Sequence, residues 1–131
     1  MRTRPRWHPE AVRPTILLVD DHDDFRALAR AVLDAEGFEV VGEATDAAGA
    51  VREASRLDPD LVLLDVMLPD GDGFEVCERI LAPGRGRPAV ILTSSRDAGA
   101  YVDRLTTTSA HGFLPKEELS GAAVLALGGV T

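Results

Sequence analysis

The stretch Ile16-Leu17-Leu18-Val19-Asp20-Asp21 decides the fold, because four consecutive apolar residues are followed at once by two acids. A continuous apolar run of this kind is typical of a strand buried on both faces. Such strands occur in parallel sheets that are covered by helices on both sides. The pattern returns at Leu61-Val62-Leu63-Leu64-Asp65 and at Ala89-Val90-Ile91-Leu92-Thr93.

The segments between these runs have the periodicity of amphipathic helices. Apolar residues from Phe25 to Leu33 share one helical face, with Asp23 or Asp24 placed to cap the helix and Gly37 placed to end it. Further helices are predicted at 47–57, 74–81, 97–105 and 117–127, further strands at 38–41 and 112–114, and a turn at 68–73. The alternation predicts an α/β fold: a doubly wound, five-stranded parallel sheet flanked by about five helices.

Length and composition set the domain organisation. The 131 residues suffice for one domain, so we expect a flexible basic arm at 1–14 and a folded domain at 15–131. The arm carries a net charge of +3 and the remainder −11, within a total of −8, which argues against nucleic acid as a direct partner of the domain. No apolar stretch is long enough for a membrane span, no secretory signal is visible, and the single Cys77 fits a reducing compartment. We therefore expect a cytoplasmic protein with no membrane partner.

Reactive side chains follow four of the predicted strands: Asp20 and Asp21, then Asp65, Thr93 and Lys116. Open α/β sheets bind ligands at the carboxyl ends of their strands. With the first strand at the centre of the sheet, these five side chains are predicted to converge on one site. His22 comes next after the acid pair and is interpreted as a solvent-facing loop residue.

Three converging carboxylates repel one another and need a cation, and a carboxylate-rich site suits Mg²⁺. One Mg²⁺ and the ammonium of Lys116 would leave the site formally neutral. A metal, a lysine and the hydroxyl of Thr93 can together stabilise a phosphoryl group, and a carboxylate can act as its nucleophile.

The chain resembles the receiver domain of two-component response regulators, a flavodoxin-like fold, from about Thr15 to Leu127. The resemblance is carried by residues 17–21, 63–73, 90–94 and 112–116, with the sequences LLVDD, LLDVMLPDGDG, VILTS and GFLPK. It implies that Asp65 is the phosphoacceptor. It also implies that Asp20, Asp21, Asp65 and the backbone carbonyl of Met67 bind the metal, with Asp20 acting partly through water.

The resemblance implies further roles near the acceptor. Thr93 and Phe113 occupy the positions of the switch hydroxyl and the switch aromatic, and Lys116 that of the lysine that pairs with phosphoryl oxygens. The side chains of Met67, Ser94 and Ser95 are expected to tune the phosphoryl lifetime, with the small Ser94 keeping the pocket open.

The implied function is that of a phosphorylated switch rather than an enzyme, since the domain assists only its own phosphorylation and dephosphorylation. Its partners would be a sensor histidine kinase or phosphotransfer protein, and a downstream protein or an output domain missing from this chain. The face built from the fourth helix, fifth strand and fifth helix would change its contacts, and a homodimer would form through the same face.

Two departures from the family pattern stand out. Glu117 replaces the proline that commonly follows the lysine, and Pro115 precedes the lysine instead. The segment 106–109, TTTS, is rich in β-branched residues where glycine is usual, so the fourth helix is expected to be short or frayed.

Other functions remain open. The domain could be an unphosphorylated interaction module, or the receiver fragment of a longer DNA-binding response regulator. A phosphatase with an aspartate nucleophile is disfavoured because Met67, not an acid, lies two residues after Asp65. A flavin site is disfavoured because the acids after the first strand would repel a phosphate.

Overall fold

Five parallel strands form one sheet in the order β2-β1-β3-β6-β7. Their bounds are Thr15–Val19 (β1), Glu39–Ala44 (β2), Leu61–Asp65 (β3), Ala89–Ser94 (β6) and Gly112–Pro115 (β7). The structure, a computed structural model, describes residues 13–129. The predicted doubly wound α/β sheet is confirmed, whereas residues 1–12 of the predicted basic arm lie outside the described residues.

The central strand of the sheet is β3, and the first strand, taken as central in the sequence analysis, lies next to it. Two strands lie on each side of β3, whereas β1 has only β2 on its outer side. All five residues of β3 are buried. The strand carrying the predicted phosphoacceptor is therefore held by ladder hydrogen bonds on both edges and by side-chain packing on both faces.

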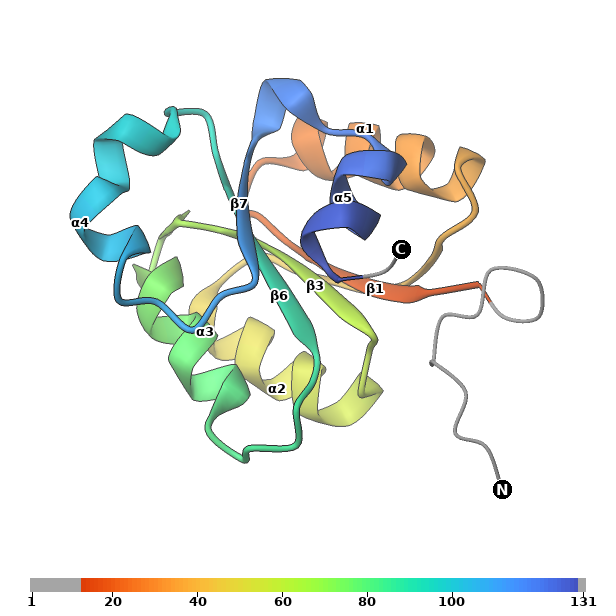
Figure 1. The fold of residues 1–131 in the computed structure, drawn as a ribbon. Coiled ribbons are helices and arrows are strands. Elements are labelled where there is room, and N and C mark those ends of the chain that lie inside the picture. Colours follow the sequence, from red (N-terminus) through yellow and green to blue (C-terminus); the bar gives the residue numbers. More distant parts are fainter. Residues whose placement is uncertain (1–12, 130–131) are drawn as a thin grey trace.

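Helices cover both faces of the sheet (Figure 1). The α-helices are α1 (Asp23–Ala35), α2 (Ala47–Leu57), α3 (Gly73–Leu81), α4 (Val102–Leu105) and α5 (Gly121–Leu127). One hydrophobic core joins α2 and α3 to the sheet, and a second joins α1 and α5 to its other face. Alternate residues of β1 enter different cores, Leu17 and Val19 on one side and Ile16 and Leu18 on the other. This explains why the strand is apolar throughout.

Helix starts are fixed by side-chain caps that the periodicity did not place. The side chains of Asp46, Asp72 and Ser120 accept hydrogen bonds from backbone N–H groups at the starts of α2, α3 and α5. The last helix therefore begins at Gly121 and not at 117, after a short 3₁₀ turn, η2 (Lys116–Glu118). The predicted aspartate cap of α1 is wrong, because His22 is the N-cap residue and caps with no side-chain hydrogen bond.

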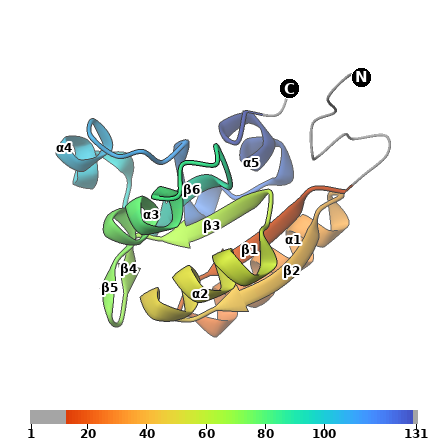
Figure 2. The ribbon, with the colours of Figure 1, turned by 90° about the horizontal axis from the view of Figure 1, so that it is seen from below.

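Three other elements differ from the prediction. The strand predicted at 38–41 runs over Glu39–Ala44, since its residues pair with all of β1. The turn at 68–73 contains a small antiparallel hairpin of β4 (Met67–Leu68) and β5 (Gly71–Asp72), which projects beside α3 (Figure 2). The helix predicted at 97–105 is a 3₁₀ turn, η1 (Ala98–Tyr101), followed by the single turn of α4. The expected shortness of the fourth helix is confirmed.

Among the described residues, no helix combines the length and the apolar character that crossing a bilayer requires.

Candidate functional site

The carboxyl ends of β1, β3, β6 and β7 meet at one edge of the sheet. Asp65 pairs directly with Thr93 in the ladder between β3 and β6, and Val19 pairs with Leu64 one residue before the acids. Lys116 follows β7, whose Pro115 pairs with Ser94. Parallel register therefore brings together side chains that are up to 96 residues apart in sequence.

An acid cluster occupies this edge. Asp20, Asp21, His22 and Asp65 each offer one ligand atom, and these four atoms lie within 4.8 Å of one another. Asp20 and Asp65 are buried, with side chains only 2% and 4% exposed, whereas the side chain of Asp21 is 37% exposed. The cluster is thus buried at its base and open to solvent at Asp21.

Lys116 supplies the positive charge of the site. Its Nζ atom lies 2.7 Å from Oδ2 of Asp20 and 3.1 Å from Oδ2 of Asp65, and it sits 4.7 Å from the centroid of the Phe25 ring. The side chain is only 14% exposed. The ammonium is held in place by two buried carboxylates and an aromatic face, which limits the directions in which it can move.

The surroundings of the two buried acids, Asp20 and Asp65, shift their pKa values in opposite directions. Burial raises the pKa of Asp65, a hydrogen bond from the Met67 N–H lowers it, and repulsion from Asp20 raises it, so that it lies above its ordinary value. Burial also raises the pKa of Asp20, but hydrogen bonds from Lys116 and His22 outweigh it and hold that pKa below its ordinary value. Burial lowers the pKa of Lys116, but its bonds to the two carboxylates outweigh this and raise it. Lys116 is therefore fully charged at neutral pH.

Hydroxyl groups of β6 adjoin the acid cluster. Thr93 is buried, and among the described residues its Oγ1 atom has no hydrogen-bond partner. The Oγ atom of Ser94 lies 3.1 Å from the Tyr101 hydroxyl and accepts a hydrogen bond from the Arg96 N–H. Of these two hydroxyls, the buried one of Thr93, on the residue that pairs with Asp65 in the ladder, is the one without a described partner.

A cleft of about 350 Å³ opens over the cluster. Its lining includes Asp21, Asp65, Lys116 and the predicted tuning residues Met67, Ser94 and Ser95. The Met67 side chain is 59% exposed, and its backbone N–H donates a hydrogen bond to Oδ1 of Asp65. The residues predicted to tune the site do line it, although their roles stay predictions.

Phe113 lies in an aromatic row next to the site. The rings of Tyr101 and Phe113 are 5.8 Å apart between centroids, and Tyr101 is also 5.8 Å from Phe74. The predicted switch aromatic is half-buried and packed against a tyrosine that itself reaches Ser94. Sequence reasoning missed Tyr101, since the short η1–α4 segment has too little periodicity to place its side chain.

The exposed loop position predicted for His22 is confirmed, but sequence reasoning missed the contact of its ring with the acid cluster. Its side chain is 64% exposed, as expected for a loop residue, but its ring turns into the acid cluster, with Nδ1 2.9 Å from Oδ1 of Asp20. The signal that could have found it is its position directly after the acid pair.

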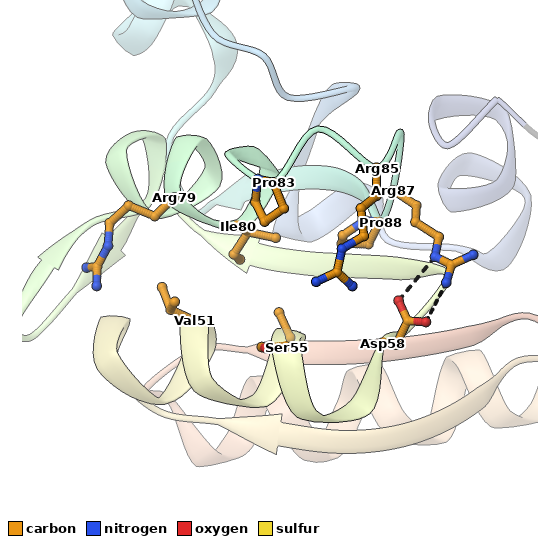
Figure 3. Close-up of a pocket in the computed structure, with 10 residues that line it drawn as sticks. Val51, Ser55, Asp58, Arg79, Ile80, Pro83, Arg85, Arg87 and Pro88 are labelled. Atoms are coloured by element: carbon orange, nitrogen blue, oxygen red, sulfur yellow. Dashed lines mark hydrogen bonds and ion pairs between the residues drawn. The ribbon is translucent and has the colours of Figure 1, made fainter.

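A second pocket, of about 190 Å³, lies between α2 and the loop that leads into β6 (Figure 3). Arg79, Arg85 and Arg87 line it, and Arg87 pairs there with Asp58. It adjoins the amino ends of β3 and β6 and so lies at the opposite edge of the sheet from the acid cluster. It contributes no residue to the candidate site.

The residues present fit a divalent cation. Three carboxylates supply hard oxygen ligands of the kind Mg²⁺ takes, and the open side of the cluster leaves room for water and for phosphoryl oxygens. The unpartnered Thr93 hydroxyl and the Lys116 ammonium stand next to them. An acid cluster, a lysine and a free hydroxyl at the carboxyl edge of a doubly wound sheet define the class of receiver-type signalling domains.

Comparison with known proteins gives the family. The model of the response regulator receiver domain matches residues 16–125, and the chain belongs to that family of two-component signal transduction domains. A transcriptional regulator of Pseudomonas aeruginosa is 35% identical over 117 residues, which are 85% of this chain and 56% of the relative. The DNA-binding response regulator MtrA of Mycobacterium tuberculosis is 46% identical over 90 residues, or 67% of this chain and 38% of MtrA.

Solved structures of receiver domains have the same fold as this chain. The NarL signal receiver domain of Mycobacterium tuberculosis superposes with a TM-score of 0.78 at 32% identity, covering 89% of this chain and 97% of that one. The chain therefore spans the receiver part of such proteins, and only 38% to 56% of the length of the two curated relatives.

Proposed function

We propose that this domain accepts a phosphoryl group on Asp65 from a sensor histidine kinase or phosphotransfer protein, with Mg²⁺ bound by Asp20, Asp21, Asp65 and the Met67 carbonyl. The observation that carries the proposal is the juxtaposition of the buried Asp65, the Lys116 ammonium 3.1 Å away and the unpartnered hydroxyl of Thr93. Mg²⁺, when bound, would neutralise charge on the phosphoryl oxygens.

The chain's own residues would supply the nucleophile and the groups that stabilise the phosphoryl oxygens. A carboxylate oxygen of Asp65 attacks phosphorus, the bond from phosphorus to the donor nitrogen breaks, and the donor imidazole keeps that electron pair. Lys116 exchanges part of its pairing with Asp65 for a phosphoryl oxygen, and the Thr93 hydroxyl donates to another. The Met67 N–H already holds the second oxygen of Asp65, which orients the carboxylate.

The response would pass through β6 to the face built from α4, β7 and α5. Turning the Thr93 hydroxyl toward a phosphoryl group would leave space that the ring of Phe113 can fill, and the Tyr101 contact would carry the change to η1 and α4. This face would bind a downstream protein, a second copy or an output domain. An output domain that binds DNA is favoured by the relation to MtrA. We place the domain in the cytoplasm and assign it no substrate other than its own acyl phosphate.

The direct test is incubation with Mg²⁺ and acetyl phosphate, followed by intact mass. We expect a mass increase of one phosphoryl group, removal of the adduct by hydroxylamine, as for an acyl phosphate, and its location on the peptide that contains Asp65. An adduct on another peptide, or none, would contradict the proposal and favour an unphosphorylated interaction module.

The substitution Lys116→Arg tests the role of the compact ammonium. The planar guanidinium keeps the charge but cannot occupy the same point between two carboxylates, so phosphorylation by acetyl phosphate is expected to slow by at least about tenfold. The rate would be followed by Phos-tag electrophoresis. The opposite exchange, Arg30→Lys, at the surface ion pair with Glu43, is the control and should leave the rate unchanged. A Lys116→Arg rate within twofold of wild type would refute this role.

A further inference from the structure

The His22 imidazole is part of the acid cluster. Its Nδ1 atom lies 2.9 Å from Oδ1 of Asp20, 3.2 Å from Oδ1 of Asp21 and 3.8 Å from Oδ2 of Asp65. The backbone N–H of His22 also donates to Oδ1 of Asp20, at 2.8 Å. The backbone and the ring of His22 thus contact the same buried carboxylate. These two contacts orient the ring although the side chain is exposed.

His22 and Lys116 use different oxygens of Asp20. Lys116 pairs with Oδ2, which is the buried side of the carboxylate, and His22 with Oδ1. The ammonium therefore does not block the approach of the imidazole. A cation held by the three carboxylates would have the lysine on one side of Asp20 and a ring nitrogen on the other.

The donor set has the size and composition of a mixed coordination sphere. Two opposite ligands of an octahedral ion with bonds of about 2.1 Å lie roughly 4.2 Å apart, close to the 4.8 Å span of the four atoms. Mg²⁺ takes oxygen ligands and releases its waters reluctantly, so an imidazole adds little to its binding. First-row transition dications accept an imidazole nitrogen more readily than Mg²⁺ does.

We propose that His22 is a fifth protein ligand of the receiver metal site, beside the three carboxylates and the Met67 carbonyl, and makes the site bind first-row transition dications, with Mn²⁺ and Co²⁺ as probes, in preference to Mg²⁺. This inference rests on the proposed metal site of the phosphoacceptor domain. It adds a nitrogen ligand, the His22 ring, to the oxygen ligands. It also adds a preference for transition dications over Mg²⁺ that three carboxylates alone would not produce.

The experiment is calorimetric titration of the full chain at one fixed pH with MnCl₂, CoCl₂ and MgCl₂, for wild type and His22→Asn. We expect the variant to lose at least about tenfold in Mn²⁺ and Co²⁺ affinity and less than twofold in Mg²⁺ affinity. Electron spin-echo modulation of bound Mn²⁺ should show ¹⁴N coupling in the wild type and none in His22→Asn.

Asp24→Asn is the matched control, because Asp24 is an exposed acid two residues further along with no described side-chain partner. It should change the affinities for all three ions by one common, small factor. An equal loss for Mg²⁺ and Mn²⁺ in His22→Asn, or no ¹⁴N coupling in the wild type, would overturn the role of His22 and leave the phosphoacceptor site intact. If none of the three ions binds, both proposals are overturned.

Discussion

Asp65→Asn is expected to acquire no phosphoryl group from acetyl phosphate and, in metal-free buffer, to unfold at a higher urea concentration than the wild type. The first effect follows because an amide cannot replace the carboxylate as nucleophile. The second follows from the position of Asp65, whose side chain is 4% exposed and adjoins another buried acid.

The sign of the stability effect follows from linkage. The pKa of Asp65 is raised by burial and by Asp20 above its ordinary value of 3.8, so the unfolded chain loses this proton at lower pH than the folded one. Stability therefore falls as pH rises through that window and stays lower at neutral pH. Asparagine cannot ionise and removes this destabilising contribution, so the gap between variant and wild type should be small at pH values below 3.8 and should widen above it.

Asp103→Asn is the control for this prediction. It removes the same charge from the exposed surface of α4, where no described residue pairs with the side chain, and should alter neither phosphorylation nor stability. An Asp65→Asn protein that accumulates the adduct would contradict the assignment of the acceptor. One that unfolds at lower urea concentration than the wild type would show that the pairing with Lys116 outweighs burial and repulsion.

Gly73→Ala is expected to lose about 2 to 3 kcal/mol of unfolding free energy and to slow phosphorylation. A Cβ atom at Gly73 would lie 2.3 Å from the backbone oxygen of Asp65 and 2.7 Å from Cα of Val66. Both are backbone atoms, and Val66 also accepts the 2.7 Å hydrogen bond from the Gly73 N–H. The clash can be relieved only if α3 and the end of β3 move apart, which displaces the phosphoacceptor.

Gly99→Ala provides the comparison. Gly99 is exposed in η1, and its added Cβ would meet only an oxygen of the Asp97 side chain, at 3.2 Å, which can rotate away. Its free energy of unfolding should stay within about 0.5 kcal/mol of the wild type. If Gly73→Ala behaves like Gly99→Ala, the close approach of α3 to β3 does not constrain the site.

The sequence by itself determined the class of fold and the chemical character of the site. Apolar runs such as Leu61–Leu64 have no polar face, so they require cover on both sides, and helical periodicity between them supplies that cover. Acids directly after such runs must lie at one edge of a parallel sheet, which is why the sequence alone groups Asp20, Asp21 and Asp65.

Only the tertiary structure decided which strand is central, where α5 begins and which way His22 and Tyr101 point. Strand order depends on pairing between segments distant in sequence, and a local pattern carries no information about which edge of β1 faces β3. The start of α5 depends on a cap by Ser120 that competes with the helical propensity of Glu117 and Glu118. The rings of His22 and Tyr101 are oriented by Asp20 and by Ser94, contacts that exist only once the carboxyl ends of the strands have come together.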